Sequence, residues 1–417
     1  MRTTLNSLQL AAKSHEEDMV NFLSDLVNLQ SVNGRNSEMA VALRIAEEAK
    51  KIDLQSKVEA ADATRPNVIA SWGNGPLGFA FIAHMDTVAP GAEETWASPP
   101  FDATQRNGRI YGRGAADNKA GIACALYTLA TIRDQLLLDG NDTRVTLAAV
   151  ADEESGATSK IGVRHLLDQN LLQAEGAIYT YTSDVVCIGH RGLLRLELFA
   201  TGRAVHTGSE EWNNGVGGTN AVMGLAAILL KLEEMDIDRS THPAFGDLSN
   251  VITPGTLFSG GEFESMVPAS ASALVDIRLL PGQDGHAILA DVETVLDKEM
   301  DRRPGFKVKA HVKNSFPGVA LPMNHPLVSI AVEVTKEATG RKWPAVGAGP
   351  GNEGYMLIEA GIPTLCGFGP TGGNAHAADE WVDITSLSNT VAMYAAIVQR
   401  YLGKIHPKET GISDQED

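Results

Sequence analysis

The sequence has few cysteines and a shortage of positive charge. Only three of its 417 residues are cysteines (Cys124, Cys187 and Cys366), and they lie far apart with no C-x-x-C pair. This scarcity argues against a disulfide framework and favours buried thiols in a reducing compartment. Lysine and arginine number 34 against 52 aspartates and glutamates, so the net charge is −18. A surface this acidic repels phosphate backbones and anionic lipids, which argues against nucleic-acid and membrane-surface partners.

Long apolar runs are also absent. No stretch of about 18 consecutive apolar residues occurs, so we expect no segment that spans a bilayer. Near the N-terminus, Lys13, Glu16 and Asp18 interrupt the apolar run that a secretory signal needs. We therefore predict a cytoplasmic protein. At about 150 residues per domain, the length of 417 residues predicts two or three domains.

The first part of the chain alternates between helical and strand patterns. Three segments carry apolar side chains at helical spacing: 15–31, 38–51 and 120–133. Three others are short apolar runs: 68–72, 78–83 and 145–150. The last two runs are nearly continuous, as expected for strands that are covered on both faces. This pattern predicts the α/β class with a mixed, mostly parallel sheet.

The pattern changes at about residue 190. Residues 193–200 alternate between apolar and polar side chains, as in a half-exposed antiparallel strand. The next segments read as helix, strand, strand, helix and strand: 220–235, 250–258, 271–280, 285–301 and 306–312. This is the β-α-β-β-α-β order of a ferredoxin-like unit. Because helical patterns return at 326–339 and 386–402, we predict one domain of residues 1–189 and 315–417, interrupted by an inserted domain of residues 190–314.

Polar side chains follow directly after predicted core strands, where open α/β sheets place their ligands. His84 and Asp86 come after the run 78–83, and residues two apart in an extended chain face the same way. His84 is therefore a candidate metal ligand, and Asp86 a candidate acceptor for the proton on its other ring nitrogen. A surface pair or a satisfied core pair is the alternative.

Two further segments carry acidic side chains. Asp117 stands at the start of the predicted helix 120–133, where it is either a metal ligand or an N-cap. Asp152, Glu153 and Glu154 follow the run 145–150. Carboxylates clustered in this way repel each other unless a cation compensates them. One glutamate can then bind the metal while its neighbour acts on a water as general base; a solvated acidic turn is the alternative.

His376 lies in a glycine-flanked loop near the C-terminus. Taken together, the four segments offer two imidazoles and at least four carboxylates. That donor set suits Zn²⁺ or Mn²⁺, as one ion or two, better than a structural cysteine-rich zinc site.

These segments, in this order and spacing, resemble the M20 metallopeptidase and amidohydrolase family over nearly the whole chain. The resemblance implies a metal-binding catalytic domain and an inserted lid and dimerisation domain. It implies that Asp117 bridges two metal ions, that His84 binds one of them, and that Glu154 and His376 complete the other. It further implies that Asp86 orients His84, that Glu153 is the general base, and that the Asp117–Asn118 peptide bond is cis.

Residues of the inserted domain also fit the family pattern. His206 resembles the histidine that, in dimeric members, reaches the partner subunit's active site and polarises the scissile carbonyl; a turn residue is the alternative. Arg278 resembles an arginine that binds a substrate carboxylate, a bidentate task suited to guanidinium. The resemblance thus implies a homodimer formed through the lid domain.

Three departures from the family pattern affect the expected chemistry. A glutamate or aspartate ligand of the first metal is usual about a dozen residues before Arg191-Gly192, but Thr180 stands there. Either Asp184 substitutes for it, or the first site is weakened and one ion binds; we favour one ion. The asparagine usual before Val267-Pro268 is replaced, and a usual Gly-Thr-Asp stretch reads Gly351-Asn352-Glu353, which makes Asn352 a candidate substrate contact.

We therefore predict a metal-dependent hydrolase that cleaves a C–N bond in a small substrate with a carboxylate. The favoured substrate is an N-acyl amino acid or a dipeptide-like amide. The alternative within the class is hydrolytic deamination of an aromatic amine, such as a nitroanthranilate, with one metal. A non-catalytic binding protein whose metal site has decayed is the alternative outside it.

Overall fold

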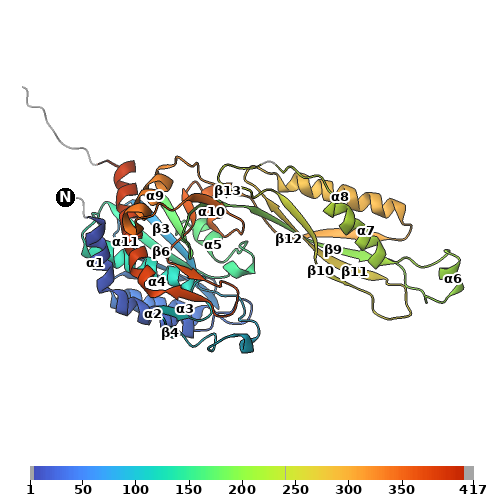
Figure 1. Ribbon diagram of the computed structural model, residues 1–417, viewed down its shortest axis with the longest axis horizontal. Helices are drawn as coiled ribbons and strands as arrows, with labels where there is room; N and C mark the ends of the chain where they lie inside the picture. Colours follow the sequence, from blue (N-terminus) through green and yellow to red (C-terminus); the bar gives the residue numbers. More distant parts are fainter. Residues whose placement is uncertain (1–3, 240, 408–417) are drawn as a thin grey trace, which may run out of the picture. The chain divides into compact units, whose positions relative to one another are not determined.

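The computed structural model describes residues 4–239 and 241–407, and these form two compact units (Figure 1). Of the described residues, unit 1 comprises 4–189, 321–346 and 352–407. Unit 2 comprises 190–239, 241–320 and 347–351.

Unit 1 is built on the larger sheet. Its main strands are β1 (Gln55–Asp62), β2 (Arg65–Trp72), β3 (Leu77–His84), β6 (Thr143–Val150), β7 (Gly176–Thr180), β8 (Val186–His190) and β15 (Thr364–Phe368). They follow the order β1-β2-β6-β3-β7-β15-β8, and the short strand β14 (Ala345–Ala348) also pairs with β8. The central pairs β6–β3, β3–β7 and β7–β15 are parallel, and the flanking pairs are antiparallel. Apolar β3 and β6 are buried on both faces, as expected of central parallel strands.

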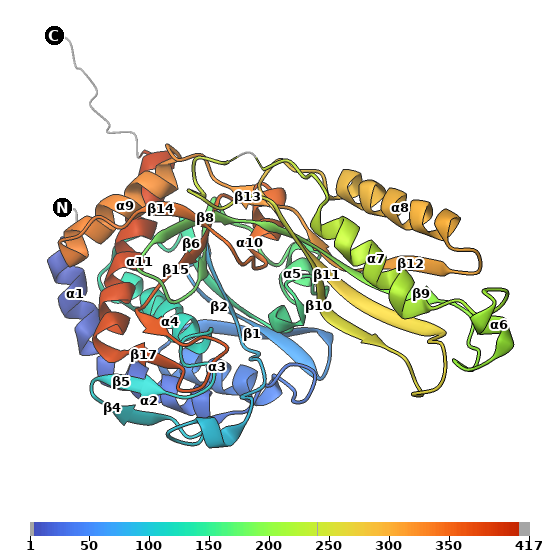
Figure 2. The ribbon, with the colours of Figure 1, turned by 45° about the vertical axis from the view of Figure 1, so that its right-hand side comes forward.

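Helices cover this sheet. They are α1 (Leu5–Ser14), α2 (Glu16–Asn28), α3 (Met39–Lys51), α4 (Lys119–Asp134), α5 (Val163–Asp168), α9 (Pro326–Thr339), α10 (Gly354–Glu359) and α11 (Ile384–Ile405). α4 is apolar on nearly every side because it lies between the sheet and the helices α1, α2 and α11, and it is buried from Lys119 to Ile132. Figure 2 shows α4 and α11 on one side of the sheet and α5 and α10 on the other.

A small antiparallel sheet joins two distant parts of unit 1. Its order is β16-β17-β5-β4, from β16 (Gly372–Gly373), β17 (Trp381–Asp383), β5 (Arg109–Tyr111) and β4 (Thr104–Arg106). The pairing of β17 with β5 fixes the loop that follows β5 beside the loop between β16 and β17. The first of these loops carries Asp117, and the second carries His376.

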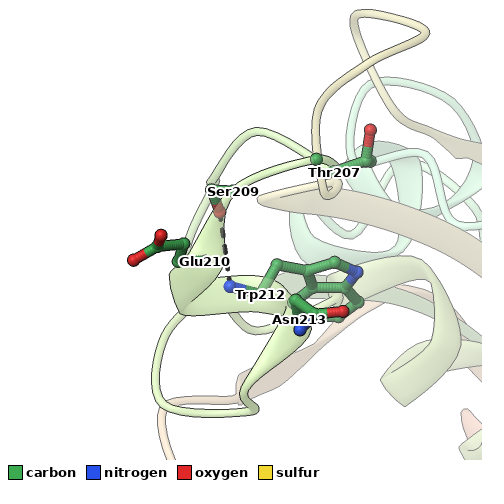
Figure 3. A pocket seen from close by; sticks show the side chains of 6 residues that line it. Thr207, Ser209, Glu210, Trp212 and Asn213 are labelled. Carbon is green, nitrogen blue, oxygen red and sulfur yellow. Dashed lines mark hydrogen bonds between the residues drawn. The ribbon is translucent and has the colours of Figure 1, made fainter.

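Unit 2 contains a four-stranded antiparallel sheet of order β10-β11-β9-β12. Its elements are β9 (Gly192–Thr201), α6 (Glu210–Asn213), α7 (Ala221–Glu233), β10 (Val251–Gly260), β11 (Ser270–Leu279), α8 (Gly285–Arg302) and β12 (Lys307–Phe316). Alternate side chains of β9 and β11, such as Leu196 and Val275, form a core with α7 and α8. Beside α6 lies a pocket lined by Thr207, Gly208, Ser209, Glu210, Trp212 and Asn213 (Figure 3).

The predicted fold class is confirmed: unit 1 has a mixed, mostly parallel sheet with helices, and unit 2 has the predicted β-α-β-β-α-β order. That unit 2 acts as a lid and dimerisation domain stays a prediction. Apolar spacing did not predict β1, β7, β8 and β15, which are either exposed or only five residues long and so lack a readable period. Among the described helices, none combines the length and hydropathy that a bilayer crossing requires.

Candidate metal centre

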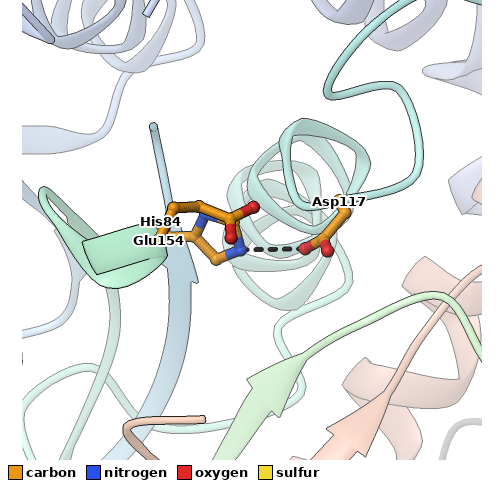
Figure 4. A group of neighbouring side chains, drawn as sticks. All are labelled: His84, Asp117 and Glu154. Atoms are coloured by element: carbon orange, nitrogen blue, oxygen red, sulfur yellow. Dashed lines mark hydrogen bonds and ion pairs between the residues drawn. The ribbon is translucent and has the colours of Figure 1, made fainter. Parts of the chain in front are cut away.

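His84 is the last residue of β3 and is 3% exposed. Its Nδ1 donates to the backbone carbonyl oxygen of Asp86 at 2.9 Å, so Nε2 is the ring nitrogen that faces the site. Nε2 lies 2.9 Å from Oδ1 of Asp117 (Figure 4). A metal ligand needs this tautomer and a fixed ring, and the strand end supplies both.

The Asp86 carboxylate has a task that the sequence did not predict. Its oxygens accept the backbone N–H groups of Glu153 at 3.2 Å and Glu154 at 3.0 Å. The nearer carboxylate oxygen lies 3.7 Å from Nδ1 of His84, beyond hydrogen-bonding distance. Asp86 thus orients His84 through its main chain, and its side chain holds the turn that carries the two glutamates.

Asp117 is not the N-cap of α4, so that alternative is wrong. The N-cap position is Asn118, without a side-chain capping bond, and the Asp117–Asn118 peptide bond is cis. The Asp117 carboxylate instead lies between two histidines, with Oδ2 3.2 Å from Nε2 of His376. The same nitrogen of His376 is 3.1 Å from Oε1 of Glu154.

These four side chains fit a divalent cation. Ligand atoms of His84, Asp117 and Glu154 all lie within 4.8 Å of one another, and His376 contacts two of the three residues. Two imidazoles and two carboxylates are a donor set that Zn²⁺ and Mn²⁺ accept. Hydrogen bonds to Asp117 and Glu154 favour the protonated form of His376 and raise its pKa to about 10.

The other titrations agree with a site built for positive charge. Burial opposes the charged form of His84, but the hydrogen bond and charge of Asp117 raise its pKa well above the ordinary value. Burial likewise opposes ionisation of Asp117, yet hydrogen bonds from His376 and His84 hold its pKa well below the usual range. Both pKa shifts reflect the attraction between the positively charged histidines and the negatively charged Asp117 that they contact.

Glu153 is buried, with 9% of its surface exposed, so the alternative prediction of a solvated acidic turn is wrong. Burial raises the pKa of Glu153 to about 8; the charge of His84 opposes this rise, and the carboxylates of Glu154 and Asp117 add to it. The turn Glu153–Ser155 is a short 3₁₀ helix directly after β6. The turn points the side chains of the two adjacent glutamates in different directions, so that Glu154 contacts His376 and Glu153 does not.

Glu380 holds the Asp117 loop and was missed by the sequence analysis. It is fully buried, and its Oε1 accepts the N–H groups of Ala116 at 2.8 Å and Asp117 at 2.9 Å. Its Oε2 accepts from the backbone of Gly114 at 3.0 Å and from Nη1 of Arg113 at 2.6 Å. A carboxylate so close to His376 in sequence was a signal, but its partners lie more than 260 positions away.

Lys119, the first residue of α4, was also missed. Its buried Nζ donates to the carbonyl oxygens of Leu26 and Leu29, each at 2.8 Å, at the end of α2. Burial lowers the pKa of Lys119 to about 7. These two bonds supply a donor to carbonyl groups at the C-terminal end of α2, and they tie the start of α4 to α2.

Thr180 and Asp184 do not join the cluster. Thr180 ends β7, fully buried, with its hydroxyl 3.0 Å from Oδ1 of Asn118 and 3.1 Å from the carbonyl oxygen of Ile82. The Asp184 side chain is 66% exposed and pairs with Arg341 at 3.2 Å. Among the described residues, the group that could hold a metal ion therefore consists of His84, Asp117 and Glu154. It includes no carboxylate from the segment 180–184.

The remaining predicted residues have partners of their own. Asn352 donates to the carbonyl oxygen of Cys366 at 2.6 Å and accepts from the N–H of Gly354 at 2.9 Å, at the start of α10. In unit 2, exposed His206 accepts the N–H of Gly208 at 3.0 Å. Arg278 donates to Asp276 at 2.7 Å, and Arg195 shares that carboxylate. Their contacts with substrate stay predictions.

Comparison with known proteins supplies a family and a fold. Residues 80–400 match the model of peptidase family M20/M25/M40. A probable succinyl-diaminopimelate desuccinylase of Staphylococcus epidermidis is 26% identical over 338 residues, covering 75% of this chain and 77% of the relative. The succinyl-diaminopimelate desuccinylase of Pseudoalteromonas atlantica is 28% identical over 400 residues, covering 91% and 97%.

Solved structures share the fold. A di-peptidase from Saccharomyces cerevisiae has a TM-score of 0.75 at 15% identity, covering 98% of this chain and all of that one. An M20 family metallo-carboxypeptidase from Sulfolobus solfataricus has a TM-score of 0.73 at 20% identity, covering 93% and 98%.

Proposed function

This chain belongs to peptidase family M20/M25/M40 and is a metal-dependent amide hydrolase, and we propose that its substrate is an N-acyl amino acid or a dipeptide-like amide bearing a carboxylate. One observation carries the proposal. The ligand atoms of His84, Asp117, Glu154 and His376 meet at the carboxyl ends of β3 and β6, with buried Glu153 next to Glu154. Such a site suits hydrolysis rather than a non-catalytic binding role.

Each side chain has a proposed task. His84, Asp117, Glu154 and His376 would hold the cation, and a bound cation would lower the pKa of water and polarise a carbonyl group. Glu153 takes a proton from the attacking water and later gives it to the leaving nitrogen. Asp86 keeps Glu153 in place through the backbone N–H that its carboxylate accepts.

We propose that one ion, Zn²⁺ or Mn²⁺, is bound tightly. Thr180 stands where the family usually has a carboxylate ligand of the first metal, and its hydroxyl donates toward Asn118 and Ile82. Asp184 is paired with Arg341. Both histidines approach the single carboxylate of Asp117, within 2.9 Å and 3.2 Å. Metal analysis after dialysis is expected to give one ion per chain, and two tightly bound ions would contradict this proposal.

A second candidate is hydrolytic deamination of an aromatic amine such as a nitroanthranilate. The observation that favours it is Thr180 in place of a carboxylate ligand, because this replacement leaves a one-metal site that differs from the dinuclear pattern of the family. This reaction releases ammonia, whereas hydrolysis of an N-acyl amino acid releases a carboxylic acid. An ammonia assay therefore separates the two candidates.

The test is a panel of N-acyl amino acids, dipeptides and aromatic amines, assayed with Zn²⁺ and with Mn²⁺. N-succinyl amino acids belong in the panel because the relatives above are desuccinylases. We expect amide hydrolysis by the wild type and a kcat lower by about 10²–10⁴-fold in Glu153→Gln. Ammonia release from the aromatic amines alone would favour the second candidate, and a kcat of Glu153→Gln equal to that of the wild type would remove the role of Glu153.

We further propose a homodimer formed through unit 2, with His206 serving the partner's site; Arg278 is proposed to bind the substrate carboxylate, and Asn352 to contact the substrate. Strand β10 is a sheet edge, and α7 packs over it through Val222 and Leu229. Large apolar side chains on these two elements are exposed: Met223, Leu230, Leu257 and Phe258. An exposed apolar edge of this kind favours pairing with a second copy.

Light scattering tests this dimer. We expect twice the chain mass for the wild type and a monomer for Leu230→Glu combined with Leu257→Glu; a monomeric wild type would contradict the proposal. We also propose a cytoplasmic location, supported by three buried cysteines that form no disulfide.

A further inference from the structure

A row of polar and charged side chains leads from β2 to the turn that carries Glu153 and Glu154. Asp152, the residue before this turn, has a left-handed backbone with φ 70°, and its side chain does not cap the turn. Its Oδ1 instead accepts from Nη1 of Arg65 at 2.6 Å and from Nδ2 of Asn33 at 3.0 Å. Two side chains that are distant in sequence therefore hold Asp152 in place.

Asn33 links this carboxylate to the metal centre. The same Nδ2 donates to Oδ2 of Asp86 at 2.6 Å, and Asp86 accepts the N–H groups of Glu153 and Glu154. Two carboxylates thus lie against one amide nitrogen. Like charges this close repel each other in a poorly solvated site, unless a cation neutralises one of them.

Arg65 is that cation, and it is itself held firmly. Its Nε lies 3.1 Å and 3.0 Å from the two carboxylate oxygens of Glu38, which is fully buried before α3, and Nη2 also donates to Glu38. The planar guanidinium therefore has one edge on Glu38 and presents Nη1 to Asp152. Arg65, Glu38 and Asn33 all precede residue 80, where the family match begins.

We propose that Arg65 is a positioning residue for the metal centre: through Asp152 and Asn33 it fixes the backbone from which Glu153 and Glu154 act. The proposal rests on the function assigned above to these two glutamates. Without Arg65, the Asp152 carboxylate would lose the cation that it contacts while Asn33 still held it near Asp86, and the left-handed turn would lose an anchor. Residues that orient ligands in this way typically change metal affinity by 10- to 100-fold when replaced.

The test compares Arg65→Met with Arg44→Met in the full chain. Arg44 is a matched control, since its side chain is 20% exposed against 19% for Arg65, and it also bridges a buried glutamate, Glu48, and an aspartate, Asp25. By titration calorimetry with Mn²⁺, we expect affinity to fall about tenfold or more in Arg65→Met and to stay unchanged in Arg44→Met. Turnover should fall about tenfold in kcat with KM changed less than about threefold.

A double-mutant cycle identifies the route. Asp152→Asn alone should weaken Mn²⁺ binding, and adding Arg65→Met to it should change the affinity little further, because both act through one contact. Additive losses, or Mn²⁺ affinity in Arg65→Met equal to that of Arg44→Met, would overturn the proposal.

Glu154→Gln separates this result from a failure of the proposed function. It should abolish tight Mn²⁺ binding; if it binds Mn²⁺ as well as the wild type, the metal centre is assigned wrongly and the role of Arg65 falls with it. Loss of binding in Glu154→Gln beside wild-type affinity in Arg65→Met overturns the role of Arg65 alone.

Discussion

Replacing Glu380 with glutamine tests how strongly the Asp117 loop is held. The wild-type carboxylate accepts four donors: three backbone N–H groups and Nη1 of Arg113. In Glu380→Gln one atom stays an acceptor, while the other becomes an NH₂ group that faces two donors. Arg113, only 1% exposed, also loses its ion-pair partner.

The expected cost follows from these contacts. A hydrogen bond to a charged group contributes about 1.5–3 kcal/mol, and breaking a buried ion pair from one side costs about 3–5 kcal/mol. These estimates overlap, because the Arg113 contact belongs to both. We therefore expect Glu380→Gln to lower the free energy of unfolding by about 3–5 kcal/mol, a large part of an ordinary domain's stability.

Urea denaturation followed by tryptophan fluorescence measures this change. Trp212 lies in unit 2, and the other four tryptophans lie in unit 1, so a Trp212→Phe background reports on unit 1. The control is Glu337→Gln, which breaks an exposed pair with Arg400 and should cost less than about 1 kcal/mol. Equal stabilities of Glu380→Gln and Glu337→Gln would refute the reasoning.

Three further predictions concern single groups. Glu153→Gln should lower kcat by about 10²–10⁴-fold while Mn²⁺ affinity by calorimetry stays within about threefold; a parallel loss of metal would make Glu153 a ligand instead. Burial raises the pKa of Glu353, whose carboxylate has no hydrogen-bond partner among the described residues, well above its ordinary value. Its stabilising contribution is therefore present at low pH and lost as pH rises through the raised pKa. Glu353→Gln should therefore gain Tm relative to the wild type between pH 5 and pH 8, and a constant difference across that range would count against this. The three buried cysteines should resist a thiol reagent in the native protein and all react in guanidinium; rapid reaction of the native protein would contradict their burial.

Much of the fold could be predicted because the spacing of apolar residues within one segment indicates whether that segment is a helix or a strand. The helix predicted over 120–133 is α4 (Lys119–Asp134), and the strand predicted over 193–200 is β9. The nearly continuous runs in β3 and β6 correctly indicated buried parallel strands. Strand β1 was missed because its residues are mostly exposed and show no apolar alternation.

The site was predictable only as far as local sequence determines it. His84, Asp117 and Glu154 stand at strand or helix ends, and these positions together with the family resemblance predicted that they converge. Which atom of Asp86 contacts His84 depends on side-chain geometry, and no spacing rule gives it. The roles of Glu380 and Arg65 depend on contacts across 263 and 87 residues, so neither could be found without the structure.

The small sheet has a consequence for how the protein acquires its metal during synthesis. Because β5 pairs with β17, the segment of Asp117 is secured by residues that leave the ribosome more than 260 positions later. A nascent chain that has already displayed His84, Asp117 and Glu154 still lacks both His376 and the strand beside it. If these residues hold the cation as proposed, its loading should follow the synthesis of β17, and a truncated product ending before β17 should bind the cation poorly.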